Sequence, residues 1–434
     1  MKVLKNKKTL ELAIVLLVFL VVNLLSQVFQ KHITLNDGRS WDGVFYYRVA
    51  TQISNGHKIS ADAPFVYRIG TPFLVAEFFK GHILAGFKAV NIVANLIAVL
   101  LFVIWLRIYM DDWRIRVLLV TLFITQWHGP VRFTYFDPTY TDPWMYVFLL
   151  MGLIAIQRIK SKPGFLAVAG LGLITFVGVL FREILLILPL TLAFITNPLP
   201  AWNDIFVSFT WKKCIQLLKK PYYPFIFVFL FGIAGFFVVH YLASQTNDYS
   251  FTQTAMDWVS NKPIPTYVLA IFITYGPLIV LPIFSWRRSL HILWEHQDML
   301  VFLLGMMLIG WIGGSDTERF LYWAMPVIYL LIGLFIQENK SLLKSPWLIL
   351  VLGASTIFSQ RLFWTVADYP NQFKTPIPVF SILSDRFQYL DLWSFFAQRT
   401  VQVVSLVEYF LFSGILIVWM KLRRSFPMSI RSED

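Results

Sequence analysis

Long apolar runs recur along the whole chain, and they constrain its fold more than any other feature. Only 14% of the 434 residues are charged and 57% are hydrophobic, whereas about 25% are charged in a typical soluble protein. Because about 20 apolar residues cross the core of a bilayer, such runs predict membrane-spanning helices. The sequence therefore predicts an all-α polytopic membrane protein, with residues 1–434 forming a single multi-pass domain.

We expect about twelve transmembrane helices, and ten to thirteen are compatible with the pattern. The apolar runs cover 10–29, 83–106, 117–127, 144–157, 164–181, 184–200, 223–243, 266–285, 299–313, 321–336, 347–361 and 401–420. The third and fourth runs are short for a crossing, so tilt or re-entrance must supply the missing length. The first run has no Ala-x-Ala-like cleavage site after it, which predicts an uncleaved helix.

The net charge of +13 does not indicate a nucleic-acid partner, because the basic residues form short clusters between apolar runs. Such clusters are typical of membrane topology, and their excess on one side predicts that both termini are cytoplasmic. We therefore expect a protein of the inner (plasma) membrane, with the bilayer as its surroundings. Cys214 is the single cysteine, which excludes an intramolecular disulfide and a cysteine metal cluster.

The large connecting segments all fall on the opposite, extracytoplasmic side. Residues 30–82 form the first outer loop and residues 362–400 another large one, with shorter segments at 128–143, 244–265 and 314–320. The cytoplasmic loops are short and basic. We therefore expect the working face of the protein to be extracytoplasmic.

Asp42 is the candidate catalytic residue in the first outer loop. It directly precedes the run Val44–Ala50, which reads as a helix at the membrane surface. A carboxylate in this position can cap exposed backbone N–H groups. Alternatively, Asp42 is a functional carboxylate at the mouth of the bundle, beside aromatic residues such as Tyr46 that suit sugar rings.

Arg68 follows Tyr67, a further candidate substrate-binding residue, in an apolar segment bounded by prolines. An arginine in such surroundings is costly unless it meets an anion. The anion is either a lipid headgroup or the phosphate of a substrate, which the planar guanidinium fits well.

Asp137 and Asp142 begin two Asp-Pro pairs in an aromatic outer segment. Asp-Pro commonly starts a turn or a helix, but two carboxylates five residues apart also suit sugar hydroxyls or a divalent cation. No His-x-x-x-His or similar ligand spacing accompanies them, so a cation is only weakly indicated and no metal site is predicted. The sequence predicts no other cofactor.

Two further pairs of opposite charges lie at the outer ends of apolar runs. Arg182 and Glu183 are adjacent, and Asp316 lies three residues before Arg319. Each pair either neutralises itself locally or contributes to a site. With Arg68 and Arg132, these arginines give four outward guanidinium groups whose convergence would form a phosphate site.

The motifs of other enzyme classes are absent from the sequence. The chain has no Gly-x-x-x-x-Gly-Lys-Ser/Thr loop, no Gly-x-Gly-x-x-Gly, no Gly-x-Ser-x-Gly and no His-Glu-x-x-His. These absences argue against nucleotide-driven chemistry on the cytoplasmic side.

The combination of motifs resembles the GT-C superfamily of integral membrane glycosyltransferases, specifically a poorly characterised bacterial branch. The resemblance lies in Asp-Gly-x-x-Tyr-Tyr (Asp42–Tyr47), Phe-x-Tyr-Arg-x-x-x-Pro (Phe65–Pro72), Arg182-Glu183 and Asp316-x-x-Arg319. It implies a GT-C-like fold and a lipid-linked sugar donor, commonly a polyprenyl-phosphate sugar. The acceptor would be a glycan, a lipid or a protein.

The resemblance also implies that Asp42 is the catalytic residue of an inverting transfer for cell-surface glycan synthesis. The first outer loop lacks the strict Asp-x-Asp or Glu-x-Asp pair of the family, and we expect no soluble C-terminal domain. Three other functions stay open: an O-antigen-type polymerase or ligase, a transporter or flippase of lipid-linked glycans, and an inactive assembly subunit. Transporters usually show repeated halves and helices broken at mid-membrane, but the charged residues here crowd the outer ends of the apolar runs.

Overall fold

The structure is a computed structural model, which describes residues 2–196, 223–341, 344–359, 365–366, 375–376, 389–390 and 393–425. Most of the predicted outer loop 362–400 and Cys214 lie outside the described residues.

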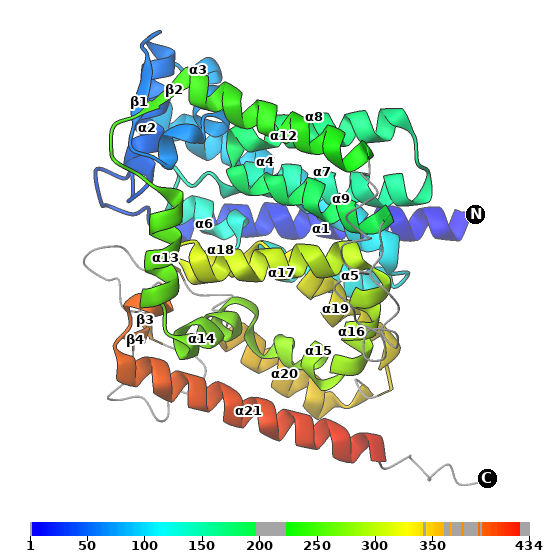
Figure 1. The fold of residues 1–434 in the computed structure, drawn as a ribbon. Helices are drawn as coiled ribbons and strands as arrows, with labels where there is room; N and C mark the ends of the chain where they lie inside the picture. Colours follow the sequence, from blue (N-terminus) through cyan, green and yellow to red (C-terminus); the bar gives the residue numbers. More distant parts are fainter. Residues whose placement is uncertain are drawn as a thin grey trace, which may run out of the picture.

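Long helices run side by side and form the body of the molecule (Figure 1). They are α1 (Lys2–Phe29), α4 (Ile83–Tyr109), α7 (Asp142–Ser161), α8 (Phe165–Phe181), α12 (Tyr223–Leu242), α17 (Gln297–Ile312) and α21 (Arg399–Ser425). Shorter helices fill the space between them: α5 (Trp113–Thr125), α9 (Ile187–Thr196), α14 (Ile264–Tyr275), α15 (Val280–Phe284), α16 (Trp286–Glu295), α19 (Met325–Glu338) and α20 (Pro346–Ser359). Single-turn helices η2 (Glu183–Leu186) and η3 (Gly276–Ile279) lead into α9 and α15.

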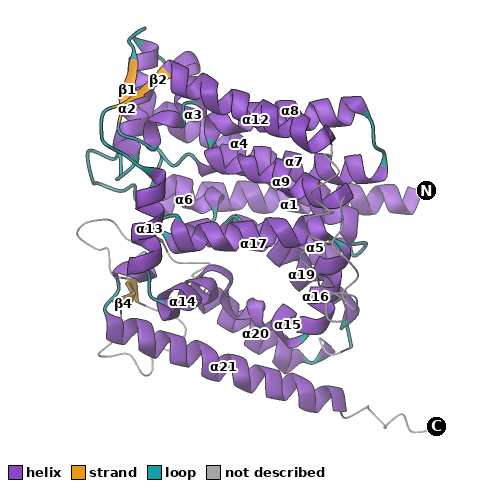
Figure 2. Cartoon of the chain, viewed as in Figure 1, coloured by secondary structure: helices purple, strands orange, loops and turns teal. Residues whose placement is uncertain are grey.

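The connecting elements gather at one end of this bundle. They are α2 (Gly43–Ser54), β1 (Ile59–Ala61), η1 (Phe65–Tyr67), α3 (Gly70–Phe78), α6 (Pro130–Phe136), β2 (Ala243–Gln245), α13 (Phe251–Asn261), α18 (Thr317–Tyr322), β3 (Thr375–Pro376), β4 (Tyr389–Leu390) and η6 (Ser394–Phe396). Figure 2 shows the strands of the described residues at this end. The start of α1 and the end of α21 lie at the opposite end (Figure 1).

Two short strand pairs join distant parts of the chain at the loop-rich end. β1 pairs in parallel with β2, and β3 pairs antiparallel with β4. Next to the first pair, the side chain of Asn247 exchanges two hydrogen bonds with the backbone of Ala63, at 2.8 and 3.1 Å. The first outer loop is therefore attached to the segment that follows α12.

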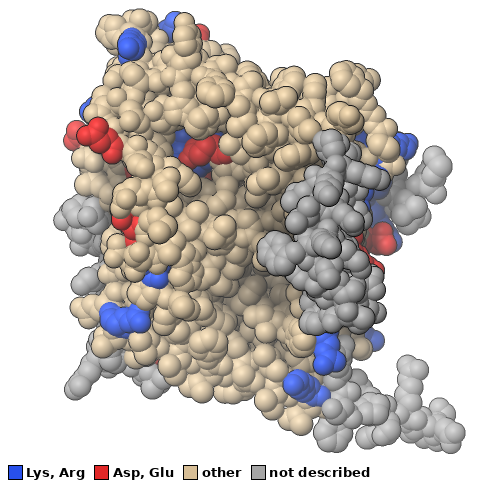
Figure 3. All heavy atoms as spheres, viewed as in Figure 1, with Lys and Arg blue, Asp and Glu red and all other residues tan. Residues whose placement is uncertain are grey.

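Within the described part of the chain, six helices are long and apolar enough to cross a membrane, which fits a membrane protein. They are Lys7–Phe29, Ile83–Tyr109, Asp142–Ser161, Tyr223–Leu242, Ile264–Phe284 and Arg399–Leu422. The pair α16 and α17 brings the number to seven if this pair, bent by 112°, is a single span. Few charged side chains lie on the face of the body that Figure 3 shows.

The expected twelve spans are not confirmed among the described residues. Helix α5 has 13 residues, and at 1.5 Å per residue it reaches only about 20 Å of the roughly 30 Å hydrocarbon core. The region 266–285 lies in the candidate span Ile264–Phe284, which consists of α14, η3 and α15 and has a positive φ of 61° at Gly276. In contrast, the run 144–157, expected to be short, belongs to the 20-residue helix α7.

Residues 128–143, which the sequence predicts to form an outer loop, are buried in the structure. Every residue from 126 to 143 is buried. The aromatic side chains of this segment explain its burial: Trp127, Phe133, Phe136 and Tyr140 pack in one apolar cluster with Ile33, Val366 and Trp393. The segment is thus part of the protein interior beneath the first outer loop.

A separate group of ion pairs lies at the end of the bundle that carries the termini. The buried carboxylate of Glu11 accepts hydrogen bonds from Arg107 and Arg116, at 2.7–3.1 Å. These contacts attach α1 to α4 and α5. The basic clusters predicted for the cytoplasmic side are therefore partly paired within the protein.

Candidate functional site

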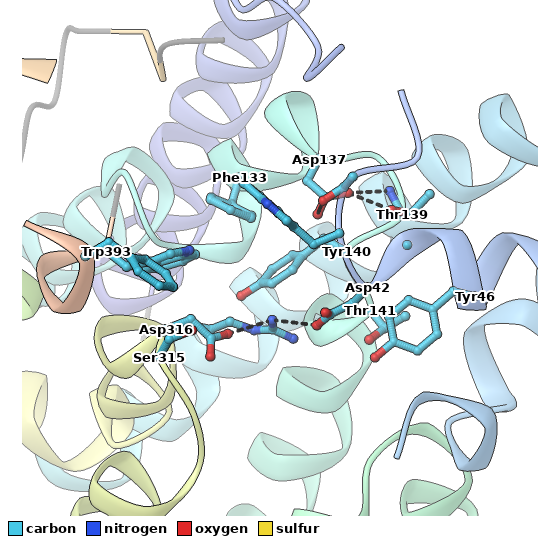
Figure 4. Close-up of a pocket in the computed structure, with 15 residues that line it drawn as sticks. Asp42, Tyr46, Phe133, Asp137, Thr139, Tyr140, Thr141, Ser315, Asp316 and Trp393 are labelled. Carbon is cyan, nitrogen blue, oxygen red and sulfur yellow. Dashed lines mark hydrogen bonds and ion pairs between the residues drawn. The ribbon is translucent and has the colours of Figure 1, made fainter. Parts of the chain in front are cut away.

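A cavity of about 440 Å³ opens at the loop-rich end of the bundle. Four separate parts of the chain form its wall: the start of α2, the segment around α6, the turn before α18 and the region of η6. Its lining residues are Ser40, Trp41, Asp42, Gly43, Tyr46, Phe133, Asp137, Thr139, Tyr140, Thr141, Ser315, Asp316, Arg319, Trp393 and Phe396. Figure 4 shows the acidic and aromatic side chains around this cavity.

Asp42 places its carboxylate in the cavity. The predicted surface helix exists as α2, but Asp42 makes no side-chain hydrogen bond to its backbone N–H groups. The capping role considered from the sequence is therefore not realised. The Asp42 side chain is 38% exposed, and its nearest ionic partner is Nη1 of Arg319, 3.7 Å from Oδ2. Burial by the surrounding protein raises the pKa of Asp42, while Arg319 opposes this effect.

Arg319 lies between the cavity and the protein interior. Its Nε and Nη2 each donate to Asp142 at 2.9 Å, and its Nη1 donates to Asp316 at 2.9 Å. The guanidinium also lies over the ring of Tyr140, 4.8 Å from its centroid. Each nitrogen of Arg319 thus already donates to a carboxylate.

Asp142 does not line the cavity, contrary to the expectation that it binds sugar or a cation. Its carboxylate is fully buried and accepts hydrogen bonds from Arg319, Arg182 and the indole N–H of Trp323. The Arg182 guanidinium lies 4.9 Å from the ring of Trp323. Asp142 therefore joins two arginines inside the protein, and its position at the start of α7 brings it there.

Asp137 does reach the cavity, from the buried segment after α6. Its Oδ2 accepts from the hydroxyl of Ser40 at 2.7 Å, and its Oδ1 accepts from the backbone N–H and hydroxyl of Thr139 at 3.0 and 2.7 Å. Burial raises the pKa of Asp137 to about 6, although these hydrogen bonds oppose the shift. The side chain is thus fixed in orientation and exposes only a small part of itself to the cavity.

Two asparagines of α4 hold the segment that carries Asp137, and the sequence analysis missed them. Asn91 donates to the carbonyls of Pro138 and Tyr140 at 3.0 and 2.6 Å. Asn95, one turn later, donates to the carbonyl of Pro130 and the hydroxyl of Thr134, both at 3.1 Å. Their spacing of four residues within an apolar run was the signal that would have identified them.

Trp393 and Phe396 form an aromatic wall of the first cavity that the sequence did not predict. The buried carboxylate of Glu318 accepts a hydrogen bond from the backbone N–H of Ser394 at 2.9 Å. On the other side of this turn, Gln402 donates to the carbonyl of Ser394 at 2.9 Å. These two contacts from α18 and α21 fix the turn that carries the wall.

A second cavity, of about 580 Å³, contains Arg68 and Glu183. Arg68 donates to Glu183 through Nε at 3.0 Å and Nη2 at 2.5 Å, and through Nη1 to the hydroxyl of Tyr46 at 3.0 Å. The Glu183 side chain is 41% exposed, whereas that of Arg68 is 9% exposed. Most of the other lining residues are apolar and belong to α8, η2, α12, α13, α17 and α18.

Tyr46 connects the two cavities. Its ring lines the first cavity, and its hydroxyl contacts Arg68 at the second. Tyr67, proposed from the sequence beside Tyr46, lines the second cavity instead and lies against His240, with 3.8 Å between ring centroids. Tyr46 and Tyr67 therefore line different cavities.

Three of the four outward arginines converge. Asp142 bridges Arg182 and Arg319, while Glu183, next to Arg182 in sequence, binds Arg68. Arg132 does not join them, since it donates to the carbonyl of Thr125 at 2.9 Å, near the end of α5.

The described residues include no group of three or more His, Cys, Asp or Glu side chains arranged to hold a metal ion. The carboxylates of Asp42, Asp137 and Asp316 line the same cavity. Asp42 and Asp316 both pair with Arg319, whereas Asp137 accepts a hydrogen bond from Ser40.

Comparison of the chain with models of known protein families, with curated proteins and with solved structures finds no match.

Proposed function

We propose that this protein is a membrane glycosyltransferase that moves a sugar from a polyprenyl-phosphate donor to an extracytoplasmic acceptor. The observation that carries the proposal is the Asp42 carboxylate. It lies 38% exposed in a cavity of about 440 Å³, and six aromatic residues line the same cavity. Apolar ring faces pack against the C–H faces of sugars, and a partly desolvated carboxylate is suited to general-base catalysis.

The second cavity supplies a place for the lipid part of the donor. Its wall is mostly apolar, which suits a prenyl chain. Arg68 supplies a guanidinium for the phosphate. Because Glu183 is the more exposed member of its pair with Arg68, donor phosphate takes the place of the Glu183 carboxylate. Tyr46 lies between Arg68 and the first cavity, so the sugar would extend past Tyr46 towards Asp42.

The chemistry needs one base and one site for the leaving phosphate. Asp42 accepts the proton of the acceptor hydroxyl while that oxygen attacks the anomeric carbon of the sugar. The bond from the anomeric carbon to the phosphate oxygen breaks, and its electron pair leaves with the lipid phosphate. Arg68 stabilises the negative charge that develops there. Attack from the side opposite the leaving group inverts the anomeric carbon.

The topology that accompanies this proposal has both termini in the cytoplasm of an inner (plasma) membrane protein. In a twelve-span arrangement, the helices too short to cross alone would tilt or re-enter within the bundle. The loop-rich end with its two cavities then faces outward. This orientation is the one in which a lipid-linked sugar and a cell-surface acceptor meet.

The proposal is tested by a transfer assay with purified protein in lipid nanodiscs. Polyprenyl-phosphate donors with radiolabelled sugars are supplied together with an acceptor fraction from the cell envelope. Asp42→Asn keeps the size of the side chain but removes the base, so transfer should fall about 100-fold or more, within the usual range for general-base catalysis. Asp37→Asn is the matched control, since Asp37 is exposed in the same loop and does not line the cavity.

Equal transfer by the parent protein and folded Asp42→Asn would contradict the assignment. Growth of long glycan chains in the assay would indicate the alternative function of an O-antigen-type polymerase or ligase. With the protein reconstituted in vesicles, movement of the labelled lipid from one leaflet to the other without sugar transfer would indicate a flippase.

A further inference from the structure

The charged side chains around the first cavity are unequal in sign. Asp42, Asp137 and Asp316 contribute three carboxylates, and Arg319 is the one Lys or Arg among the described residues that line it. Arg319 is already engaged, because its nitrogens donate to Asp316 and to Asp142 behind the wall. A ligand in this cavity therefore meets excess negative charge with no uncommitted lining cation.

The charged groups of the first cavity also affect the pKa values of Asp42 and Asp137. Burial is the main reason that the pKa values of Asp42 and Asp137 are raised. Arg319 opposes the shift at both groups, and one neighbouring carboxylate adds to it in each case. Asp316 acts on Asp42 in this way, and Asp42 acts on Asp137. Among the described lining residues, three carboxylates would repel a further anion in the cavity and only Arg319 would attract it, and such charge interactions are strong where protein excludes water.

The remaining lining groups suit an uncharged, hydroxyl-rich ring. The carboxylates accept hydrogen bonds from O–H or N–H groups. Aromatic rings around them provide apolar contact for a sugar face; they are Trp41, Tyr46, Phe133, Tyr140, Trp393 and Phe396. A protonated amine on the sugar would be attracted by the same carboxylates.

We propose that the first cavity accepts neutral or amine-bearing sugars and excludes sugars that carry a carboxylate or a phosphate on the ring. This inference rests on the proposed function and specifies its sugar. The lipid phosphate of the donor is compatible with it, because Arg68 belongs to the second cavity.

The experiment compares three small glycosides on the full-length protein in nanodiscs, by ligand-observed NMR titration. Methyl β-glucoside and methyl β-glucuronide share a ring and differ in the C6 group, which is CH₂OH in one and carboxylate in the other. The third probe is methyl 2-amino-2-deoxy-β-glucoside. We expect the glucuronide to bind at least tenfold more weakly than the glucoside, and the amino sugar to bind at least as well as the glucoside.

Charge-neutralising variants test whether the cavity carboxylates cause the preference. Asp137→Asn and Asp316→Asn should each reduce the glucoside-to-glucuronide ratio of affinities threefold or more. Asp37→Asn, in the exposed turn outside the lining residues, should leave this ratio unchanged. Thermal unfolding of each variant verifies that it is folded.

Tight binding of the glucuronide would overturn the inference, as would a lack of binding of all three glycosides. The transfer assay tests the proposed function separately from these binding measurements. If a uronic acid is transferred from its polyprenyl-phosphate donor as fast as glucose, the inferred sugar preference is refuted and the proposed glycosyltransferase function stands. If the neutral and amino glycosides bind selectively but no lipid donor supports transfer, the proposed glycosyltransferase function is refuted and the inferred sugar preference of the first cavity stands.

Discussion

Asp142 and Arg319, 177 residues apart in the sequence, form a bidentate ion pair in which both hydrogen bonds are 2.9 Å long. The Asp142 carboxylate is fully buried and also accepts a hydrogen bond from Arg182. The pair joins the start of α7 to α18, directly behind the first cavity. It therefore sets the position of the guanidinium that lies nearest to Asp42.

Asp142→Asn should destabilise the protein strongly. Without the carboxylate, Arg182 and Arg319 remain buried as neighbouring like charges, and the loss of one partner of a buried ion pair costs about 3–5 kcal/mol. The control is Glu338→Gln, which removes an exposed pair with Arg288 and should change stability by less than about 1 kcal/mol. Thermal unfolding in one detergent provides the comparison, and similar transition temperatures for the two variants would refute the structural role of Asp142.

Arg68→Lys should weaken use of the lipid donor by about 10- to 100-fold, because charge-assisted hydrogen bonds contribute about 1.5–3 kcal/mol each. The loss should appear as a higher KM for the donor. If Arg68 only anchors the protein to lipid headgroups, Lys should substitute well, since it also reaches the interface. Transfer rates measured against donor concentration, with thermal stability recorded, separate these outcomes.

Glu183→Gln is the companion to this variant. Since the Glu183 carboxylate occupies the place proposed for donor phosphate, its neutralisation should leave the donor KM unchanged or lower it. A large increase in the KM of Glu183→Gln would show that phosphate does not replace this carboxylate. Arg182→Lys and Arg319→Lys should mainly lower stability, because both arginines are committed to Asp142.

Asp137 should make stability depend on pH. Its pKa is raised to about 6 in the folded protein, above an unfolded value of about 3.9. The folded state thus binds its proton more tightly, and stability falls as pH rises from about 4 to about 6, by at most about 3 kcal/mol. Asp137→Asn lacks this ionisation, so the stability of the variant relative to the parent should improve between pH 4 and pH 7. Apparent Tm values of both proteins across this range provide the measurement, and a constant difference would contradict the prediction.

Cysteine labelling in intact cells tests the orientation. In a Cys214→Ser background, Lys58→Cys places a thiol on the exposed surface of the loop-rich end, and Lys162→Cys places one after α7 at the other end. A membrane-impermeant thiol reagent should label Lys58→Cys in intact cells and Lys162→Cys only after permeabilisation. The opposite pattern would put both cavities in the cytoplasm and exclude an extracytoplasmic transfer.

The sequence by itself determined the local structure. Apolar runs are sufficient to form helices that suit a bilayer, because backbone hydrogen bonds must be satisfied within each segment. The runs that predicted α4, α12 and α21 therefore lie in helices of 20 to 27 residues. The run Val44–Ala50 after Asp42 likewise predicted α2, whose Tyr46, Val49 and Ala50 are buried on one face.

Only the tertiary structure decided which charges meet and which face a cavity. Asp137 and Asp142 looked equivalent in sequence, but Asp137 lines the first cavity and Asp142 is enclosed by two arginines and Trp323. Residues 128–143 were predicted as an outer loop, and only the structure shows that aromatic packing and two asparagines of α4 bury them. The reason is physical: a local pattern sets backbone conformation, whereas burial and ion pairing depend on residues that the fold brings from far along the chain.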